Sequence, residues 1–152
     1  MGIAILAPVP CVHLARGLDT CVAQGRVAFG SNAVEVFLDK HGTCAIPEGS
    51  RVFIATTRPQ YGNGHLHSPG KAAFEATFVQ WTPADNRGKH LDQILRPSST
   101  LNDTDFIGFW EVSGLQALLK PIPFSSFADA STGAPLKMIN LLGPRKVELP
   151  GN

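Results

Sequence analysis

The stretch that decides the fold reads Phe106-Ile-Gly-Phe-Trp-Glu-Val112, then Ser113-Gly114, then Leu115-Gln-Ala-Leu-Leu-Lys-Pro-Ile-Pro-Phe124. The first part alternates in character and is rich in aromatic residues, which predicts a β-strand. Ser113-Gly114 predicts a turn. In the third part, Pro121 and Pro123 exclude a helix interior, so an extended segment is expected there. A strand that leads into such a segment is typical of a small closed sheet.

Further strands are expected on the N-terminal side of this stretch. Arg51–Thr57 and Lys71–Trp81 are apolar runs that follow turn residues. Ile3–Val9 predicts an opening strand, and the alternation over Ala33–Leu38 predicts another. Pro59–Gly70 has no periodicity and carries three glycines and two prolines, so it predicts a long loop, and long irregular loops often carry binding functions.

Two helices are expected between these strands. Val12–Gln24 has apolar residues on one helical stripe, and Gly25 is well placed to end it. Thr82-Pro83 predicts the start of a second helix, with Thr as the cap and Pro at the first helical position, and Pro97 would close it. The apolar side of that second helix would be Leu91, Ile94 and Leu95.

Composition favours one folded, strand-rich domain. The chain has 152 residues, 43% hydrophobic and 16% charged, with 15 glycines and 12 prolines. We therefore expect a single α+β domain over residues 1–152, for which the order of the elements predicts a small mixed β-barrel with two or three flanking short helices. The net charge of +1 gives no strong attraction to polyanions, so a nucleic-acid role would require basic residues gathered on one face.

The cysteine count and the N-terminal segment predict a cytoplasmic protein. Three cysteines make no disulfide framework and fit a reducing compartment. The apolar run Ile3–Val9 is too short to span a bilayer and has no basic leader. No membrane role is expected, and the oligomeric state stays open.

The order of these elements resembles the PUA-like superfamily of small β-barrels, and within it the EVE and ASCH domains. The resemblance lies in a Gly-containing turn before Arg51-Val-Phe-Ile54, in Phe74-Glu-Ala-Thr-Phe-Val79, and in Phe109-Trp-Glu-Val-Ser-Gly-Leu115 followed by Leu119-Lys-Pro-Ile-Pro-Phe124. It covers most of the chain. It implies a PUA-like barrel that binds nucleic acid without a cofactor.

One part of the resemblance can be followed residue by residue. ASCH domains carry a Gly-x-Lys-x-x-Glu-x-Arg signature, and Gly30 to Phe37 has the same spacing. Gly30 and Glu35 match, whereas Asn32 replaces the Lys and Phe37 replaces the Arg. Without these two cations, phosphate binding or carbonyl activation loses its usual groups, which counts against ASCH hydrolase chemistry.

The leading prediction is a binding module for RNA or a modified base, held in a cleft beside the barrel. Such a cleft needs aromatic surfaces for stacking and polar groups for the base edge. The candidate binding residues are Asn32, Glu35, Thr56, Thr57, Arg58, Tyr61, His65, His67 and Trp110. Each also has an ordinary structural explanation; Trp110, for example, shares a strand face with Phe106 and Val112 and would suit the core.

Two alternatives remain open. The first is a small ASCH-like hydrolase or ribonuclease acting on RNA or a modified nucleoside, with Glu35 or Glu75 as general base and Lys71 or Arg58 as electrophile. The second is a protein-interaction domain, which would present an apolar surface patch.

Metal binding is the weaker interpretation of the histidines and cysteines. His65-Leu-His67 places two imidazoles on one side of an extended segment, and Cys11-Val-His13 with His41-Gly-Thr-Cys44 would supply four ligands. Short Cys/His spacings arise freely by chance, and no metal is expected.

Overall fold

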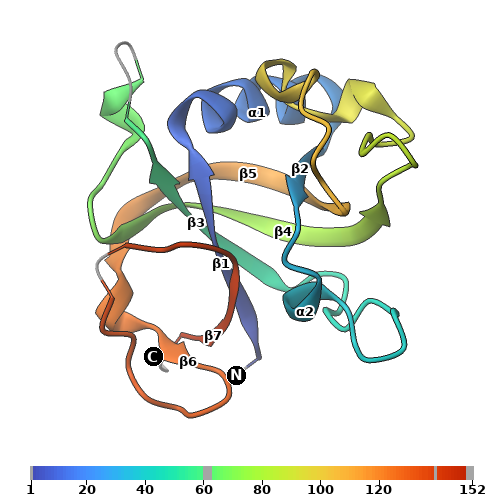
Figure 1. The fold of residues 1–152 in the computed structure, drawn as a ribbon. Helices are drawn as coiled ribbons and strands as arrows, with labels where there is room; N and C mark the ends of the chain where they lie inside the picture. The colour runs from blue at the N-terminus through green and yellow to red at the C-terminus, as the bar shows by residue number, and fades with distance from the viewer. Residues whose placement is uncertain (1, 60–62, 139, 150–152) are drawn as a thin grey trace.

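The structure is a computed structural model that describes residues 2–59, 63–138 and 140–149. Its centre is a seven-stranded mixed sheet with the order β2-β5-β4-β3-β1-β7-β6 (Figure 1). The strands are β1 (Ala4–Pro10), β2 (Val27–Ser31), β3 (Arg51–Thr57), β4 (Lys71–Pro83), β5 (Gly108–Pro123), β6 (Ala128–Asp129) and β7 (Arg145–Glu148). The helices are α1 (Cys11–Gln24) and α2 (Val34–Phe37), with single 3-10 turns η1 (Gly64–Leu66), η2 (Gln93–Leu95), η3 (Ser98–Thr100) and η4 (Phe124–Ser126).

The middle of the sheet is apolar on both faces. β1 runs parallel to β3, with Ile5 opposite Val52 and Val9 opposite Thr56. Alternate residues of β1 enter two different cores, Ile5 on the α1 side and Leu6 on the other. This is why the opening strand and Arg51–Thr57 read as continuous apolar runs, and both predicted strands are confirmed.

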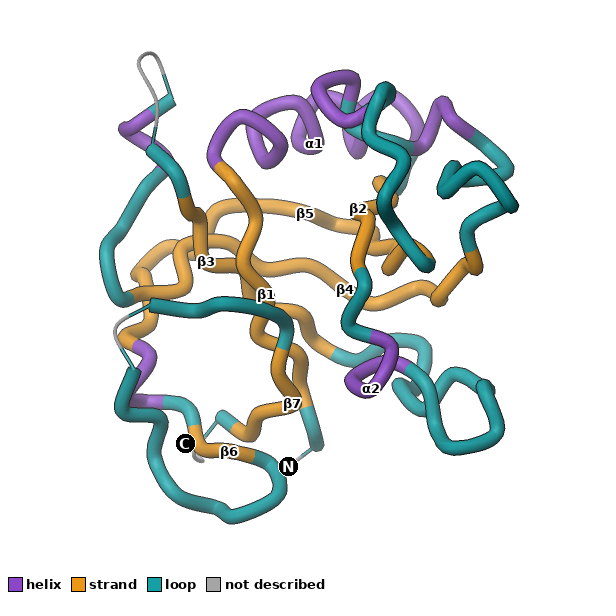
Figure 2. Tube along the Cα trace, viewed as in Figure 1, coloured by secondary structure: helices purple, strands orange, loops and turns teal. Residues whose placement is uncertain are grey.

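Helix α1 is also confirmed, and it covers one face of the sheet. Leu14 and Cys21 on its stripe are buried against that face. Gly25 ends the helix with φ 81°, and its N–H donates to the Cys21 carbonyl at 2.8 Å. The segment between β4 and β5 crosses the same face beside α1, as Figure 2 shows, and η2 and η3 contact the helix there.

The second predicted helix is wrong. Thr82 and Pro83 are the last residues of β4, and an irregular segment with two 3-10 turns follows. The Asp85 side chain accepts from the backbone N–H of Arg87 (2.8 Å) and of Lys89 (2.9 Å), which folds a tight turn in place of a helical one. The apolar residues Leu91, Ile94 and Leu95 predicted a helix, but they do not share one buried face, because Leu91 and Ile94 are exposed.

The turn at Ser113-Gly114 is wrong as well, because β5 continues through it. Gly114 has φ 63°, and the pairing of β4 with β5 shifts register at the neighbouring step between Glu75 and Thr77. The glycine therefore marks a β-bulge inside one long strand. The proline-locked segment is extended, as expected, and forms the second half of that strand.

The strand expected at Ala33–Leu38 is a turn of helix instead, α2. The strand lies upstream at Val27–Ser31, paired with β5. Ser31 Oγ accepts from the Ala33 N–H at 3.0 Å, which bends the chain out of the sheet. Phe37 is buried and stacks on Trp81 with ring centroids 5.0 Å apart, and tertiary packing of this kind overrides a short alternating pattern.

The α+β class with a dominant mixed sheet is confirmed, whereas the closed barrel is not. β2 and β6 are the two ends of the strand order, so the sheet is open in its hydrogen bonding. The second core lies where β6, β7 and η4 fold across the lower part of Figure 1. Of the described helices, none has the length and apolar character needed to cross a bilayer.

Candidate functional site

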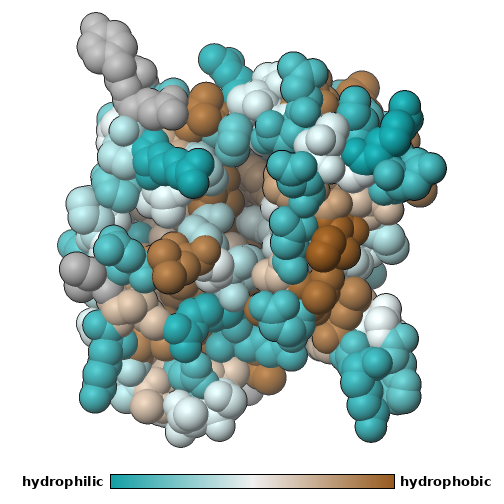
Figure 3. Space-filling model, in the orientation of Figure 1, coloured by the Kyte–Doolittle hydropathy of each residue, from teal (hydrophilic) through white to brown (hydrophobic). Residues whose placement is uncertain are grey.

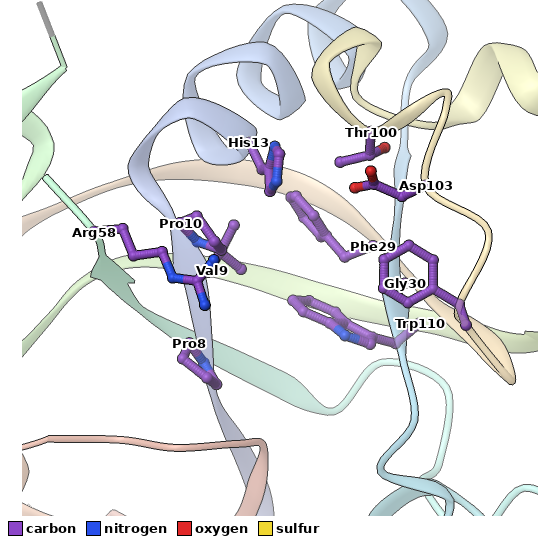
Figure 4. Close-up of a pocket in the computed structure, with 11 residues that line it drawn as sticks. Pro8, Val9, Pro10, His13, Phe29, Gly30, Arg58, Thr100, Asp103 and Trp110 are labelled. Carbon is purple, nitrogen blue, oxygen red and sulfur yellow. The ribbon is translucent and has the colours of Figure 1, made fainter. Parts of the chain in front are cut away.

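A cavity of about 260 Å³ opens under the first turn of α1. In Figure 3 the surface is hollowed at this place, with hydrophilic side chains on its rim. Five parts of the chain meet there: the end of β1 with the start of α1, β2, the exit of β3, residues 100–106, and β5 (Figure 4). The lining residues are Pro8, Val9, Pro10, His13, Phe29, Gly30, Arg58, Thr100, Asp103, Phe106 and Trp110.

One wall of the cavity is aromatic. Phe29 and Trp110 pack with ring centroids 4.8 Å apart, and Trp110 is only 2% exposed. Phe106 lies directly over the backbone of Gly30, where a Cβ atom would collide with its ring. Gly30 therefore permits a third aromatic ring to approach the wall. Trp110 serves both as core residue and as cavity lining, so the two interpretations of it are compatible.

Polar groups line the rest of the cavity. His13 Nδ1 lies 2.8 Å from Ser99 Oγ. Burial lowers the pKa of the His13 imidazole and Arg58 lowers it further, while Asp103 raises it by a smaller amount than burial lowers it. The ring is therefore neutral at neutral pH. In Figure 4, Arg58 lies on one side of His13, and Asp103 and Thr100 lie on the other.

Arg58 is held in an unusual backbone conformation. Its φ is 49°, and it is the only non-glycine residue with positive φ in the described part of the chain. Thr56, two residues before it, is fixed by the last residue of η1 and the residue after it. Thr56 Oγ1 donates to the Leu66 carbonyl at 3.0 Å, and His67 Nδ1 donates to the Thr56 carbonyl at 3.0 Å. These two hydrogen bonds hold the end of β3 in place, and they thereby determine the position of the Arg58 backbone.

A buried arginine supports the polar rim from behind. Arg96 is 2% exposed, and its guanidinium donates to the carbonyl oxygens of Thr100 and, at 3.0 Å, of Asp103. It also lies 5.0 Å from the centroid of the Phe109 ring. Its Nε has no hydrogen-bond partner among the described residues. Arg96 therefore fixes the part of this segment that carries the lining residues Thr100 and Asp103.

The structure places only some of the predicted binding residues at this cavity. Arg58 and Trp110 line it, and Thr56, Thr57, Arg58 and His67 line a second cavity at the β3 exit. His65 is exposed on η1. Tyr61 lies outside the described residues.

The other candidates lie elsewhere or have structural contacts. Asn32 Oδ1 accepts from the Ile107 N–H at 2.8 Å and so ties β2 to the start of β5. Glu35 is exposed on α2, since the strand that would have aimed it into a cleft does not form. Glu75 forms an ion pair with Arg51 at 2.7 Å across β3 and β4, and Lys71 is exposed at the start of β4. None of these four residues lines the aromatic cavity.

The cysteines and histidines do not gather into a metal site in the part of the chain that the structure describes. No three of its potential ligand side chains come together. Cys11 and Cys21 are buried thiols on α1, whereas Cys44 is exposed.

Sequence reasoning missed Phe29, Thr100 and Asp103 as lining residues, and considered His13 only as a metal ligand. These residues come from segments far apart in sequence, and no local pattern joins them. The usable signal was Gly30, a glycine inside a strand, which often marks a close approach of another group.

In comparisons with known proteins, no family model, no curated protein and no solved structure matches the chain. The function of the candidate site is therefore inferred from the chemistry of its own residues.

Proposed function

We propose that this protein is a nucleic-acid-binding module that holds one unstacked base in the cavity under α1, and that its open sheet is a PUA-like one. The observation that carries the proposal is the combination of an aromatic wall and a polar rim around one small cavity. Phe29, Phe106 and Trp110 supply π-surfaces, and Thr100, Asp103 and His13 supply hydrogen-bonding groups. Single-stranded nucleic acids are recognised through this pairing of stacking and edge contacts.

The size and charge of the cavity agree with such a ligand. Sites for drug-sized molecules occupy about 300–1,000 Å³, so a cavity of about 260 Å³ suits a single heterocycle. The neutral His13 ring can exchange hydrogen bonds with an uncharged base edge, and the Asp103 carboxylate can accept from an exocyclic amine. Arg58 on the other side suits a backbone phosphate.

The small net charge of +1 determines how strongly the binding of nucleic acid should depend on salt. A long-range basic field is absent from the composition, so affinity comes from stacking and a few local contacts. We expect a shallow dependence on salt, in contrast to proteins that neutralise many phosphates.

Titration with short single-stranded RNA and DNA at low salt tests the proposal, with tryptophan fluorescence and backbone chemical shifts as readouts. Binding should perturb signals of Phe29, Trp110 and the 100–106 segment. Asp103→Asn and His13→Ala should each weaken binding about tenfold, which corresponds to about 1.4 kcal/mol. Glu35→Gln is the matched control, because that exposed carboxylate lies on α2 and should leave affinity unchanged. Failure of every RNA and DNA ligand to bind under these conditions would overturn the proposal.

A hydrolase remains the second candidate because one cavity holds both His13 and Asp103. These two groups are suited to general acid–base chemistry, and they replace Glu35 and Glu75 in that role. Incubation with RNA and with acylated nucleosides, followed by product analysis, distinguishes the two functions. Turnover that disappears in His13→Ala would favour the enzyme; recovery of intact ligand favours the binding module.

A further inference from the structure

A second cavity, of about 230 Å³, lies at the β3 exit and shares Arg58 with the aromatic cavity. It is bounded by the end of β3, the segment from His67 to Gly70, η4 and residues 140–141. The side chain that borders both cavities is thus a cation, and no described residue forms an ion pair with it.

The backbone of Arg58 is fixed where the two cavities meet, and its side chain is exposed there. Its backbone has φ 49°, a conformation that an arginine adopts only where the surroundings hold it. Here the surroundings include the hydrogen bonds from Thr56 to Leu66 and from His67 to Thr56, which fix Thr56, two residues before Arg58. Arg58 also lies close enough to the aromatic cavity to lower the pKa of His13.

The second cavity has the chemistry of a sugar and base subsite. Thr57 and Ser68 supply hydroxyl groups, Asn140 supplies an amide, and Phe124 supplies an apolar surface. His67 contributes its second ring nitrogen. His67 Nδ1 lies 3.0 Å from the Thr56 carbonyl oxygen, which can only accept, so Nδ1 donates in this contact, and in the tautomer that does so without a second ring proton Nε2 is an acceptor.

We propose that the ligand is a strand of at least two nucleotides, whose linking phosphodiester lies on Arg58, with one base in the aromatic cavity and the adjoining nucleotide in the second cavity. A planar guanidinium between two cavities fits a phosphodiester because that group is the anion that joins two nucleosides. The inference rests on the proposed function and adds a second subsite and a minimum ligand length to it.

The test compares nucleosides, their 3′- and 5′-monophosphates, dinucleoside monophosphates, and dinucleosides with an uncharged methylphosphonate linkage, in ribose and deoxyribose forms. The dinucleoside monophosphate should bind at least about tenfold more tightly than the better mononucleotide. The methylphosphonate should lose most of that gain, as should Arg58→Gln with the charged ligand.

Variants of the second cavity separate the two subsites. Thr57→Val and Ser68→Ala should weaken dinucleotide binding severalfold while mononucleotide binding stays unchanged. Asp103→Asn, in the aromatic cavity, should weaken both. Unfolding curves in urea provide the check that each variant is folded.

The outcomes distinguish the second subsite from the proposed base-binding function on which it rests. If mononucleotides bind the aromatic cavity but dinucleotides bind no more tightly, or if the gain survives Arg58→Gln, the second subsite is wrong while the base-binding function stands. If neither class of ligand binds, both proposals fail. A gain confined to the ribose or the deoxyribose series supports the inference and identifies the sugar.

Discussion

His90 Nε2 donates a hydrogen bond to Glu111 Oε2 at 2.9 Å in the interior of the protein, where the glutamate is 0% exposed. The donor assignment follows from the other ring nitrogen, because His90 Nδ1 accepts from the Asp92 N–H at 2.8 Å. Gln80 and Thr82 on the neighbouring strand also donate to the Glu111 carboxylate. The network joins β4, β5 and the segment between them, close in the chain to the residues that form the polar rim.

The Glu111 network predicts a loss of stability in acid. Burial raises the pKa of this carboxyl, but the hydrogen bonds from His90, Thr82 and Gln80 outweigh burial and lower the pKa from 4.5. A folded-state pKa below the unfolded value stabilises the protein above pH 4.5, and this stabilisation is lost as the pH falls through the folded-state pKa.

Glu111→Gln should therefore destabilise the protein by about 2 kcal/mol at neutral pH, since the donors around it lose a charged acceptor. Urea unfolding between pH 3 and 7 measures both the destabilisation and its disappearance in acid. Glu48→Gln, an exposed carboxylate, is the control. An unchanged acid profile in Glu111→Gln would contradict the assignment.

His13 should produce a separate pH effect at higher pH. Its folded-state pKa is lowered from 6.5, chiefly by burial, so between the two pKa values the unfolded chain binds more protons than the folded one. Stability should consequently decrease as the pH falls below 6.5. In His13→Gln this decrease should be smaller. Titration of the His13 ring by NMR measures the pKa directly; a pKa at or above 6.5 would disprove the prediction.

Arg96 should matter for both stability and binding. Replacement by Lys keeps the charge but removes the planar guanidinium, whose Nη2 donates to both carbonyl oxygens while its plane contacts the Phe109 ring. We expect a loss of about 2 kcal/mol in unfolding free energy, together with weaker binding of nucleotides because the polar rim is loosened. Arg87→Lys on the exposed part of the same connection is the matched control and should change neither quantity.

Gly30→Ala should displace the Phe106 ring from the aromatic wall. The new methyl group would occupy the position of that ring, and overpacking of this kind costs about 1–3 kcal/mol. Because Phe106 is only half-buried, the ring can move aside, so we expect the lower end of the range and a severalfold loss of affinity. Gly64→Ala has open space around the added methyl group and serves as control; equal effects of the two variants would exclude a specific role of Gly30.

The elements that could be predicted from the sequence are those whose pattern matches their final environment. β1, β3 and α1 have long, unambiguous apolar patterns and were placed within one or two residues. The strand predicted over Ala33–Leu38 is wrong because six alternating residues also suit one helical turn, and the burial of Phe37 favours the helix. The bulge at Gly114 carries the local signature of a turn, and only the partner strand distinguishes them.

The candidate site was predictable only in part for a related reason. Arg58 and Trp110 are prominent in their own segments, at a strand exit and in an aromatic run. His13 and Asp103 line one cavity only because the segment before β5 folds against α1. Ser99 contacts His13 of that helix, and Arg96 donates to the Asp103 carbonyl oxygen. No spacing between residues 13 and 103 encodes that proximity.

The prolines at the end of β1 determine how far the sheet can grow on that side. β7 pairs with Ala4, Ile5 and Leu6 and no further, and the next residues toward the cavity include Pro8 and Pro10. Neither proline has an N–H to offer to an additional strand. An extended chain that adds beside β1 there, from this molecule or another, finds no N–H donor at Pro8 or Pro10, which disfavours closure of the cavity entrance by an added strand.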